Sequence, residues 1–224
     1  MKQAVRWSGI VSLGLAGAGL AVLHILPTPR LHATTGAVVS YQPWNFLSEY
    51  VRTDYAPIMI ACFVFLGLGT LATATMLRYL RREAILLTVA GVSLLLLSLF
   101  PTDLADLTTD AVTCGQSTRI EPCTLAGRIH NPISTLVFLP IFLVIASVCV
   151  RNFRQPQWRR VTRLSAVCGA LALCCLIATP AYLHLFDWQG RLWTGLTQRS
   201  LVFPALLWIT GLLFLSEDIA PRKA

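Results

Sequence analysis

Six uninterrupted apolar stretches, each close to the length of a membrane-crossing helix, constrain this chain more than any other feature. A hydrocarbon core about 30 Å thick requires about 20 helical residues, because each residue rises about 1.5 Å. Transmembrane β-barrels are excluded, because their strands alternate polar and apolar residues. The sequence predicts an all-α integral membrane bundle, a single domain over residues 1–224, with spans at Trp7–Leu26, Pro57–Leu77, Ala84–Phe100, Pro132–Val150, Thr162–Leu183 and Ser200–Ser216.

The composition favours a membrane protein over a nucleic-acid-binding one. Hydrophobic residues make up 55% of the 224 and charged residues 12%, whereas soluble domains are about 25% charged. A formal charge of +8 alone would suit nucleic acid, but the basic residues lie in short clusters beside the apolar stretches. Topology signals are placed in this way. We therefore expect membrane lipids as partners and no nucleic acid.

The first apolar stretch follows Lys2 and Arg6, an arrangement that signal peptides share. Its apolar core is too long for a signal peptide, and no small-x-small cleavage site follows Pro27. We therefore expect this stretch to be retained as the first membrane span.

The distribution of basic residues predicts the orientation of the bundle. Of the 18 lysines and arginines, 12 fall on the side of the predicted spans that also carries both termini. By the positive-inside rule this side is cytoplasmic, in the plasma membrane (the cell's inner membrane). The long connections then face outward, where functional sites are more plausibly built. The 12 residues are Lys2, Arg6, Arg78, Arg81, Arg82, Arg151, Arg154, Arg159, Arg160, Arg163, Arg222 and Lys223.

The longest polar interruption is Phe100–Ser134, which this orientation places outside. It contains Cys114 and Cys123, the only cysteines outside the predicted spans. In a bacterium the outer side is oxidising, so we predict a disulfide between them. Closing a loop of about ten residues would contribute about 2–3 kcal/mol in the chain-entropy model.

The two ends of this interruption carry candidate site residues. Asp103 lies just beyond the third span, where the helix dipole disfavours a carboxylate, so a cation nearby would stabilise it. Candidates for that cation are Arg128, His130 and Arg199, and the alternative is a solvated Asp103. If the fourth helix begins at Asn131-Pro132, His130 lies at its mouth; if it begins near Pro122, His130 and Ser134 share a helical face.

Two further outer segments contribute candidates. Ser48 and Glu49 precede the second span, in a stretch whose aromatic spacing predicts a short helix in the membrane interface. Glu49 could equally face water or cap the following helix. Arg199 lies at the mouth of the sixth span, where it either snorkels outward or pairs with Asp103 or Glu49.

All four histidines lie outside or at the outer boundary of the predicted spans. Imidazoles together with carboxylates can bind a metal, which makes His24, His130 and His184 weak metal candidates. Haem ligation by His24 and His184 is a further alternative. The sequence contains no His-x-x-x-His or Glu-x-x-His pair. We therefore expect no metal and no cofactor.

Four short motifs occur in order along the chain: Leu47-Ser48-Glu49-Tyr50, Phe100-Pro101-Thr102-Asp103, Gly127-x-x-His130 and Gly195-Leu196-x-Gln198-Arg199. Together they resemble the domain-of-unknown-function 998 family of bacterial and archaeal polytopic membrane proteins. The resemblance covers nearly the whole chain and implies a six-helix fold with no established activity. The loop between Asp103 and His130 is longer than the family pattern.

The leading functional hypothesis is a non-enzymatic membrane component, such as an assembly factor, a sensor or a partner subunit, in which the outer cluster ties helix mouths together. Such a protein could bind a membrane-protein partner or form a homo-oligomer. The alternative is an outer-face enzyme or binding protein acting on lipid headgroups. There a carboxylate would orient a histidine and an arginine would hold negative charge. Transport is disfavoured because the spans carry almost no ionisable residue at their midplane. The cluster comprises Ser48, Glu49, Asp103, His130, Ser134 and Arg199.

Overall fold

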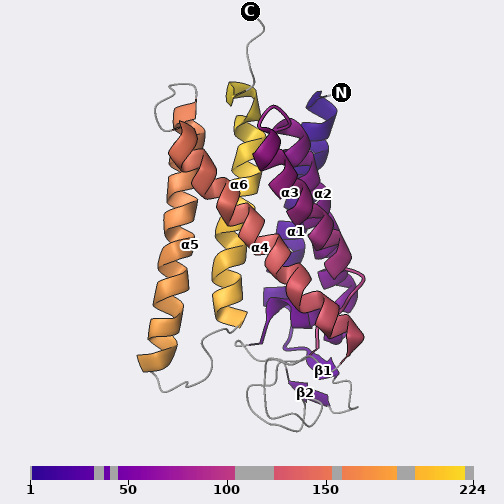
Figure 1. The fold of residues 1–224 in the computed structure, drawn as a ribbon. Helices are drawn as coiled ribbons and strands as arrows, with labels where there is room; N and C mark the ends of the chain where they lie inside the picture. Colours follow the sequence, from indigo (N-terminus) through magenta and orange to yellow (C-terminus); the bar gives the residue numbers. More distant parts are fainter. Residues whose placement is uncertain are drawn as a thin grey trace, which may run out of the picture.

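The chain forms a helical bundle in which successive long helices run in opposite directions (Figure 1). The computed structural model describes residues 2–32, 38–40, 45–103, 124–152, 158–185 and 195–219, with the backbone alone at 38–40, 151–152, 179–185 and 216–219. The long helices within these residues are α1 (Lys2–Ile25), α2 (Ala56–Met76), α3 (Arg81–Leu97), α4 (Leu125–Asn152), α5 (Arg159–Leu185) and α6 (Gly195–Ile219).

Five of these helices are long and apolar enough to cross a membrane. They are α1, α2, α4, α5 and α6. The all-helical membrane architecture expected from the apolar stretches is therefore supported for five of the six predicted spans. The remaining helix, α3, has 17 residues and packs against α2 and α4.

Small elements close one end of the bundle. The strands β1 (Arg30–His32) and β2 (Val38–Ser40) pair antiparallel, with Leu31 opposite Val39. The 3₁₀ helix η1 (Leu47–Arg52) follows and leads into α2. We call this end, where α1 ends and α2 begins, the η1 end. The opposite end, where α1 begins and α6 ends, is the terminal end (Figure 1).

The α4 helix begins earlier than the stretch Pro132–Val150 predicts. Thr124 precedes its first residue, and the Thr124 hydroxyl oxygen accepts the Gly127 N–H at 3.0 Å, which is an N-terminal cap. Pro132 and Pro140 consequently lie inside the helix. The predicted start at Asn131-Pro132 is therefore wrong, and the alternative of an earlier start, with His130 inside the helix, is correct.

Close helix packing builds the first half of the bundle. A Cβ atom added at Gly67 of α2 would lie 3.0 Å from the Gly91 carbonyl oxygen of α3, so the two backbones nearly touch there. Small residues at helix interfaces allow such close approach. The hydroxyls of Thr70 and Thr73 donate to carbonyls one turn earlier in α2, as intramembrane threonines do.

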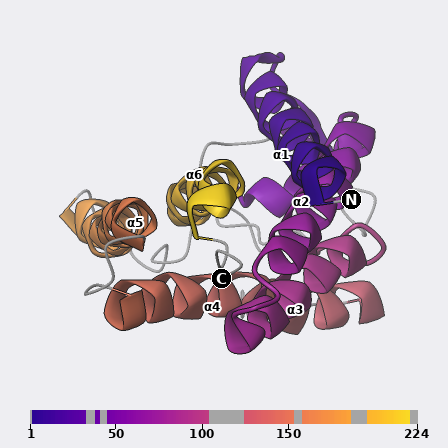
Figure 2. The ribbon, with the colours of Figure 1, turned by 90° about the horizontal axis from the view of Figure 1, so that it is seen from above.

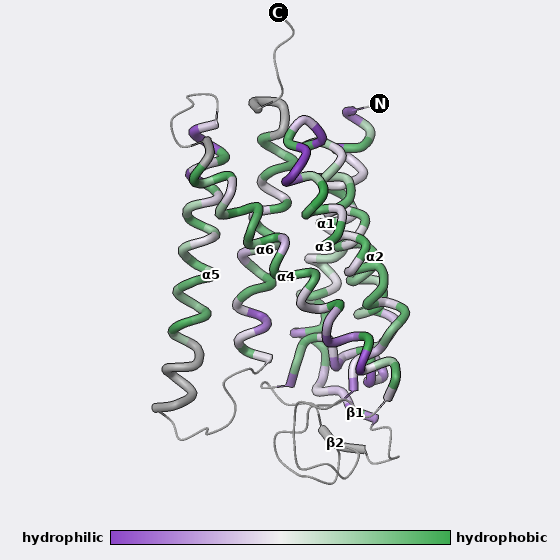
Figure 3. Tube along the Cα trace, viewed as in Figure 1, coloured by the Kyte–Doolittle hydropathy of each residue, from purple (hydrophilic) through white to green (hydrophobic). Residues whose placement is uncertain are grey.

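The second half of the bundle is organised by α4, which crosses diagonally from the η1 end beside α3 to the terminal end beside α5 (Figures 1 and 2). The α6 helix packs against α5 and returns to α1 and α2. Trp208 of α6 is fully buried and donates its indole N–H to the Ser165 hydroxyl of α5 at 2.8 Å. Hydrophobic residues dominate the middle of the bundle, and hydrophilic ones gather toward its ends (Figure 3).

Candidate functional site

A pocket lies between η1, α2, α3, α4 and α6. It contains about 640 Å³ of space that no atom fills, including the part open to the outside. Its walls are mainly apolar, with Phe63, Leu94, Val137 and Ile209 among the lining residues. The polar side chains that line it are Ser48, Thr70, His130, Ser134 and Gln198.

Apart from Thr70, the polar lining lies at one end of the pocket. Thr70, the one polar residue from the middle of a helix, donates its hydroxyl to the Leu66 carbonyl at 2.7 Å. Ser48 belongs to η1, whereas His130 lies in the second turn of α4 and Gln198 in the first turn of α6. These three and Ser134 are therefore all at the η1 end, and the rest of the pocket runs toward the middle of the bundle.

His130 is buried, with 3% of its surface exposed. Its Nδ1 lies 2.7 Å from the Phe100 carbonyl oxygen, just beyond the end of α3. A carbonyl can only accept, so Nδ1 carries the proton and the neutral ring presents an unprotonated Nε2. Within the part of the chain that the structure describes, no group hydrogen-bonds Nε2. A hydrogen-bond acceptor is thus available in the pocket wall.

Gln198 presents the opposite polarity. Its Oε1 accepts the Leu47 backbone N–H at 2.5 Å, which anchors η1 to the first turn of α6. The amide NH₂ of Gln198 is then the part available to the pocket. Ser48 is also buried in the lining, and the Ser134 hydroxyl donates to the Asn131 carbonyl at 2.7 Å while keeping its lone pairs.

Asp103 forms the centre of a cluster that joins η1, α3 and α4. Its Oδ1 accepts from the Thr124 hydroxyl at 2.7 Å and from Arg52 Nη2 at 3.3 Å, and its Oδ2 accepts from the Thr124 N–H at 2.8 Å. Arg52 also donates from Nε to the Thr102 carbonyl at 2.8 Å. We call Arg52, Thr102, Asp103 and Thr124 the α3–α4 clasp.

The cation beside Asp103 is Arg52 rather than Arg128, His130 or Arg199. The Asp103 side chain is 8% exposed, so the alternative of a solvated carboxylate is wrong. His130 does not hydrogen-bond Asp103, because Phe100 holds its Nδ1. Within the described part of the chain, Asp103 and His130 therefore form no carboxylate–histidine hydrogen bond.

A second cluster joins η1 to α1 and α6. Glu49 is fully buried, so the alternative in which it faces water is wrong, and its Oε2 accepts from Asn45 Nδ2 at 2.7 Å. Arg199 donates from Nη1 to the Asn45 carbonyl at 2.9 Å and from Nε to His24 Nε2 at 3.2 Å. We call His24, Asn45, Glu49 and Arg199 the α1–α6 clasp.

Gly195 allows this second clasp to close. It is the first residue of α6 and is buried against the Asn45 carbonyl. A Cβ atom at this position would overlap that carbonyl and the Arg199 guanidinium. The glycine in the Gly195-Leu196-x-Gln198-Arg199 motif is therefore explained by close backbone approach.

The metal candidates do not converge in the described structure. His24 Nε2 accepts from Arg199, and its Nδ1 donates to the Leu20 carbonyl at 2.7 Å, so both ring nitrogens are engaged. No group of three or more potential metal ligands occurs among the described residues. The side chain of His184 and the predicted disulfide between Cys114 and Cys123 lie outside the described residues.

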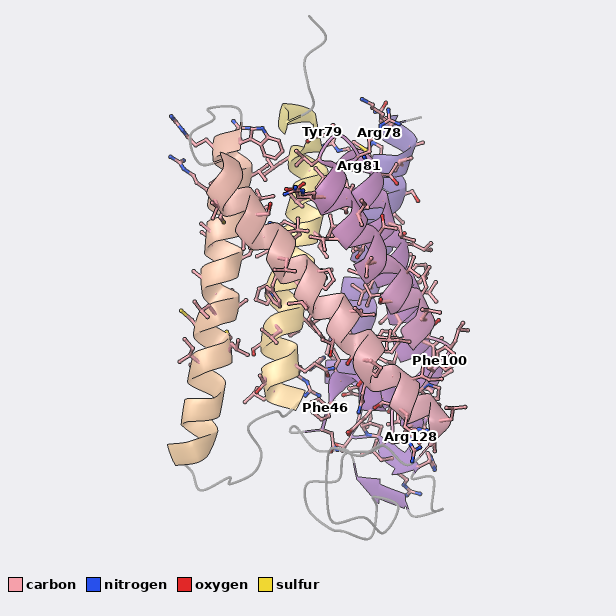
Figure 4. All side chains as sticks on the ribbon, in the orientation of Figure 1. Phe46, Arg78, Tyr79, Arg81, Phe100 and Arg128 are labelled. Carbon is pink, nitrogen blue, oxygen red and sulfur yellow. The ribbon has the colours of Figure 1, made fainter. Side chains whose placement is uncertain are left out.

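The bundle carries polar side chains at both ends (Figure 4). Phe46, Phe100 and Arg128 are labelled at the η1 end, and Arg78, Tyr79 and Arg81 at the terminal end. We call the polar end of the pocket, which Ser48, His130, Ser134 and Gln198 line, its mouth; this mouth and both clasps belong to the η1 end.

Comparison with known proteins finds one family. The family model described as "Protein of unknown function (DUF998)" matches residues 37–215, which is well over half of the chain. This range includes η1, both clasps apart from His24, and every residue that lines the pocket. The resemblance inferred from the four short motifs is thereby confirmed. No curated protein and no solved structure matches the chain.

Proposed function

We propose that this chain, which belongs to the DUF998 family, is a non-enzymatic multi-pass protein of the plasma membrane that holds one amphipathic lipid in its pocket. The observation that carries the proposal is the division of the pocket into a polar mouth and an apolar body. Lipids have the same division.

The depth of the pocket fits one leaflet of a bilayer. Its α6 wall extends from Gln198 to Ile209, which at about 1.5 Å per residue corresponds to about 16 Å along the helix. The hydrocarbon core is about 30 Å thick. A chain that enters at Gln198 would therefore reach about the middle of the membrane.

We place the pocket mouth in the outer leaflet. The terminal end carries Lys2, Arg6, Arg78, Arg81 and Arg82, and the positive-inside rule assigns such an end to the cytoplasm. Both termini are then cytoplasmic, and the η1 end faces outward. In this arrangement α3, with 17 residues, is the sixth span, and it packs against α2 and α4.

The ligand reaches the pocket from the bilayer, between α4 and α6. On α2 and α3 the lining residues are buried, as with Met59 and Leu97. On α6, Gln198, Val202 and Leu206 recur every four residues along one face, and each is half-buried. Ser134 and Phe138 of α4 are half-buried as well. The pocket is thus most open where these two helices face each other.

A second candidate function is acyl transfer or hydrolysis, because Ser48 and His130 both line the pocket. A serine nucleophile requires a nearby base, and His130 Nε2 has the required lone pair. Against catalysis, Asp103 is engaged by Arg52 and Thr124 and does not orient the ring. Binding without covalent chemistry therefore accounts for more of the geometry.

The test compares lipid binding by a variant whose pocket is filled with a larger side chain and by a matched variant changed on the exposed face of the same helix. Ala205 lines the pocket and is buried, whereas Leu207 is 55% exposed on the other side of α6. Ala205→Trp should reduce lipid binding at least tenfold, and Leu207→Trp should leave it unchanged. Val202→Trp, at a half-buried lining position, is a second blocking variant that requires less repacking.

Purified protein in dodecyl maltoside is equilibrated with 1-monooleoylglycerol, oleic acid and dioleoylphosphatidylglycerol, and bound lipid is counted by native mass spectrometry. We expect one lipid per chain in the wild type and in Leu207→Trp, recovered with its mass unchanged. Equal retention by folded Ala205→Trp or Val202→Trp would show that the lipid binds elsewhere. Recovery of a cleaved lipid, abolished by Ser48→Ala, would support the catalytic candidate instead.

A further inference from the structure

We infer that the lipid held in this pocket is a neutral acylglycerol, whose head carries a free hydroxyl and an ester carbonyl. This inference rests on the proposed function and adds the class of head group. It follows from the hydrogen-bonding groups that the protein's own contacts leave available at the pocket mouth.

His130 selects for a hydrogen-bond donor. Its Nδ1–H is fixed by the Phe100 carbonyl, so Nε2 can only accept while the ring is neutral. A hydroxyl group would donate to Nε2. A carboxylate or phosphate oxygen would instead bring its own lone pairs against the Nε2 lone pair. The α4 side of the mouth therefore favours an alcohol over an anion.

Gln198 selects for a hydrogen-bond acceptor. Its Oε1 accepts the Leu47 N–H. The group that remains for the ligand is therefore the amide NH₂, which can only donate. An ester carbonyl is an acceptor without charge. Ser48 adds a hydroxyl that can serve either partner. A donor next to an acceptor is the pattern of a glycerol monoester.

The cations near the mouth are engaged by the protein. Arg52 donates to the Thr102 carbonyl and to Asp103, and Arg199 donates to His24 and to the Asn45 carbonyl. Among the described residues, no lysine or arginine lines the pocket. A phosphate head would consequently be desolvated without a positive partner, which is costly.

The test varies the ligand rather than the protein, so that folding is not disturbed. The matched series is 1-monooleoylglycerol, its ether analogue 1-O-oleylglycerol, which lacks the carbonyl, and methyl oleate, which lacks the hydroxyls. Oleic acid and oleoyl lysophosphatidic acid represent the anionic heads. Dissociation constants are measured by native mass spectrometry of wild-type protein in dodecyl maltoside.

We expect 1-monooleoylglycerol to bind about fivefold more tightly than the ether analogue and at least fivefold more tightly than methyl oleate, at about one net hydrogen bond each. Both anionic lipids should bind more weakly than 1-monooleoylglycerol. Gln198→Glu keeps the acceptor for the Leu47 N–H and removes the amide donors. In this variant the ester and the ether should bind equally well.

The outcomes separate the two proposals. If an anionic lipid binds most tightly, or if the three neutral ligands bind alike, while Ala205→Trp still abolishes binding, the acylglycerol inference is overturned and the lipid pocket stands. If no member of the series binds, or if Ala205→Trp leaves binding intact, the proposed function itself fails. If Gln198→Glu preserves the preference for the ester, Gln198 does not read the carbonyl and the inference is overturned.

Discussion

Replacing Asp103 with asparagine should destabilise the bundle by about 3 kcal/mol, and the reason lies in how many donors face this carboxylate. The Thr124 N–H, the Thr124 hydroxyl and Arg52 Nη2 all donate to it. Asparagine offers one oxygen and one NH₂ group. If the amide oxygen faces Arg52 and the Thr124 hydroxyl, the NH₂ group faces the Thr124 N–H. If the amide is flipped, its NH₂ group faces Arg52.

The magnitude follows from this conflict. A hydrogen bond to a charged group contributes about 1.5–3 kcal/mol, and a buried donor left without a partner costs about 1–3 kcal/mol. The Asp103 side chain is 8% exposed and that of Arg52 is 21% exposed, so water compensates only in part. One hydrogen bond is lost, and the asparagine NH₂ group faces another donor, either the Thr124 N–H or Arg52. Together these two effects should lower the free energy of unfolding by about 3 kcal/mol.

The assay is unfolding by dodecyl sulfate in mixed micelles, followed by circular dichroism. The matched control is Asp54→Asn at the same end of the bundle. Asp54 pairs with His32 at 3.2 Å, but the two side chains are 63% and 53% exposed, so this change should cost less than about 0.5 kcal/mol. A cycle with Arg52→Gln should give a coupling energy of about 1 kcal/mol between Arg52 and Asp103. If Asp103→Asn costs no more than Asp54→Asn, the clasp does not stabilise the fold.

Three further changes test other parts of the structure. Gly195→Ala should lower the yield of folded protein by more than half, measured by gel filtration in detergent, because its Cβ overlaps the Asn45 carbonyl; a normal yield would refute the close approach. Asn45→Asp places a second carboxylate against buried Glu49 and should cost more than about 2 kcal/mol in the same unfolding assay; a smaller loss than in Asn45→Ala would contradict this. Burial raises the pKa of the Tyr79 hydroxyl, which has no hydrogen-bond partner among the described residues. The folded state therefore holds this proton more tightly than the unfolded state, and stability is lost as the pH rises above about 10. Tyr79→Phe should be at least as stable as the wild type at pH 7 and should lose less stability between pH 9 and pH 11; parallel losses would refute this assignment.

The positions of the helices were predictable because bilayer thickness sets the length of an apolar helix. The start of α4 was not predictable, because a local cap lies upstream of the proline that usually marks the first turn of a helix. Asn131-Pro132 is a typical helix start, yet the cap is Thr124, seven residues before Asn131. Its hydroxyl oxygen accepts the Gly127 N–H. Once α4 starts at Leu125, His130 lies inside it and can reach the Phe100 carbonyl.

The candidate residues were predictable by type and location, but their partners were not. Arg52 reaches Asp103, and Gln198 reaches the Leu47 N–H, because η1 lies across the end of the bundle. Neither contact follows from spacing, since the residues are 51 and 151 positions apart. Asn45 shows no sequence signal beyond its place ahead of η1, although it connects Glu49 to Arg199 through its side chain and its backbone.

The 3₁₀ helix η1 is shared by all three features of this end of the bundle. Glu49 belongs to the α1–α6 clasp, Arg52 to the α3–α4 clasp, and Ser48 between them lines the pocket. A ligand that binds only the native arrangement stabilises it, by about 2.7 kcal/mol at a concentration 100 times its dissociation constant. That gain is close to the loss of about 3 kcal/mol expected for Asp103→Asn. Saturating lipid should therefore restore most of the stability of this variant, because the ligand and the clasps hold the same six-residue segment in place.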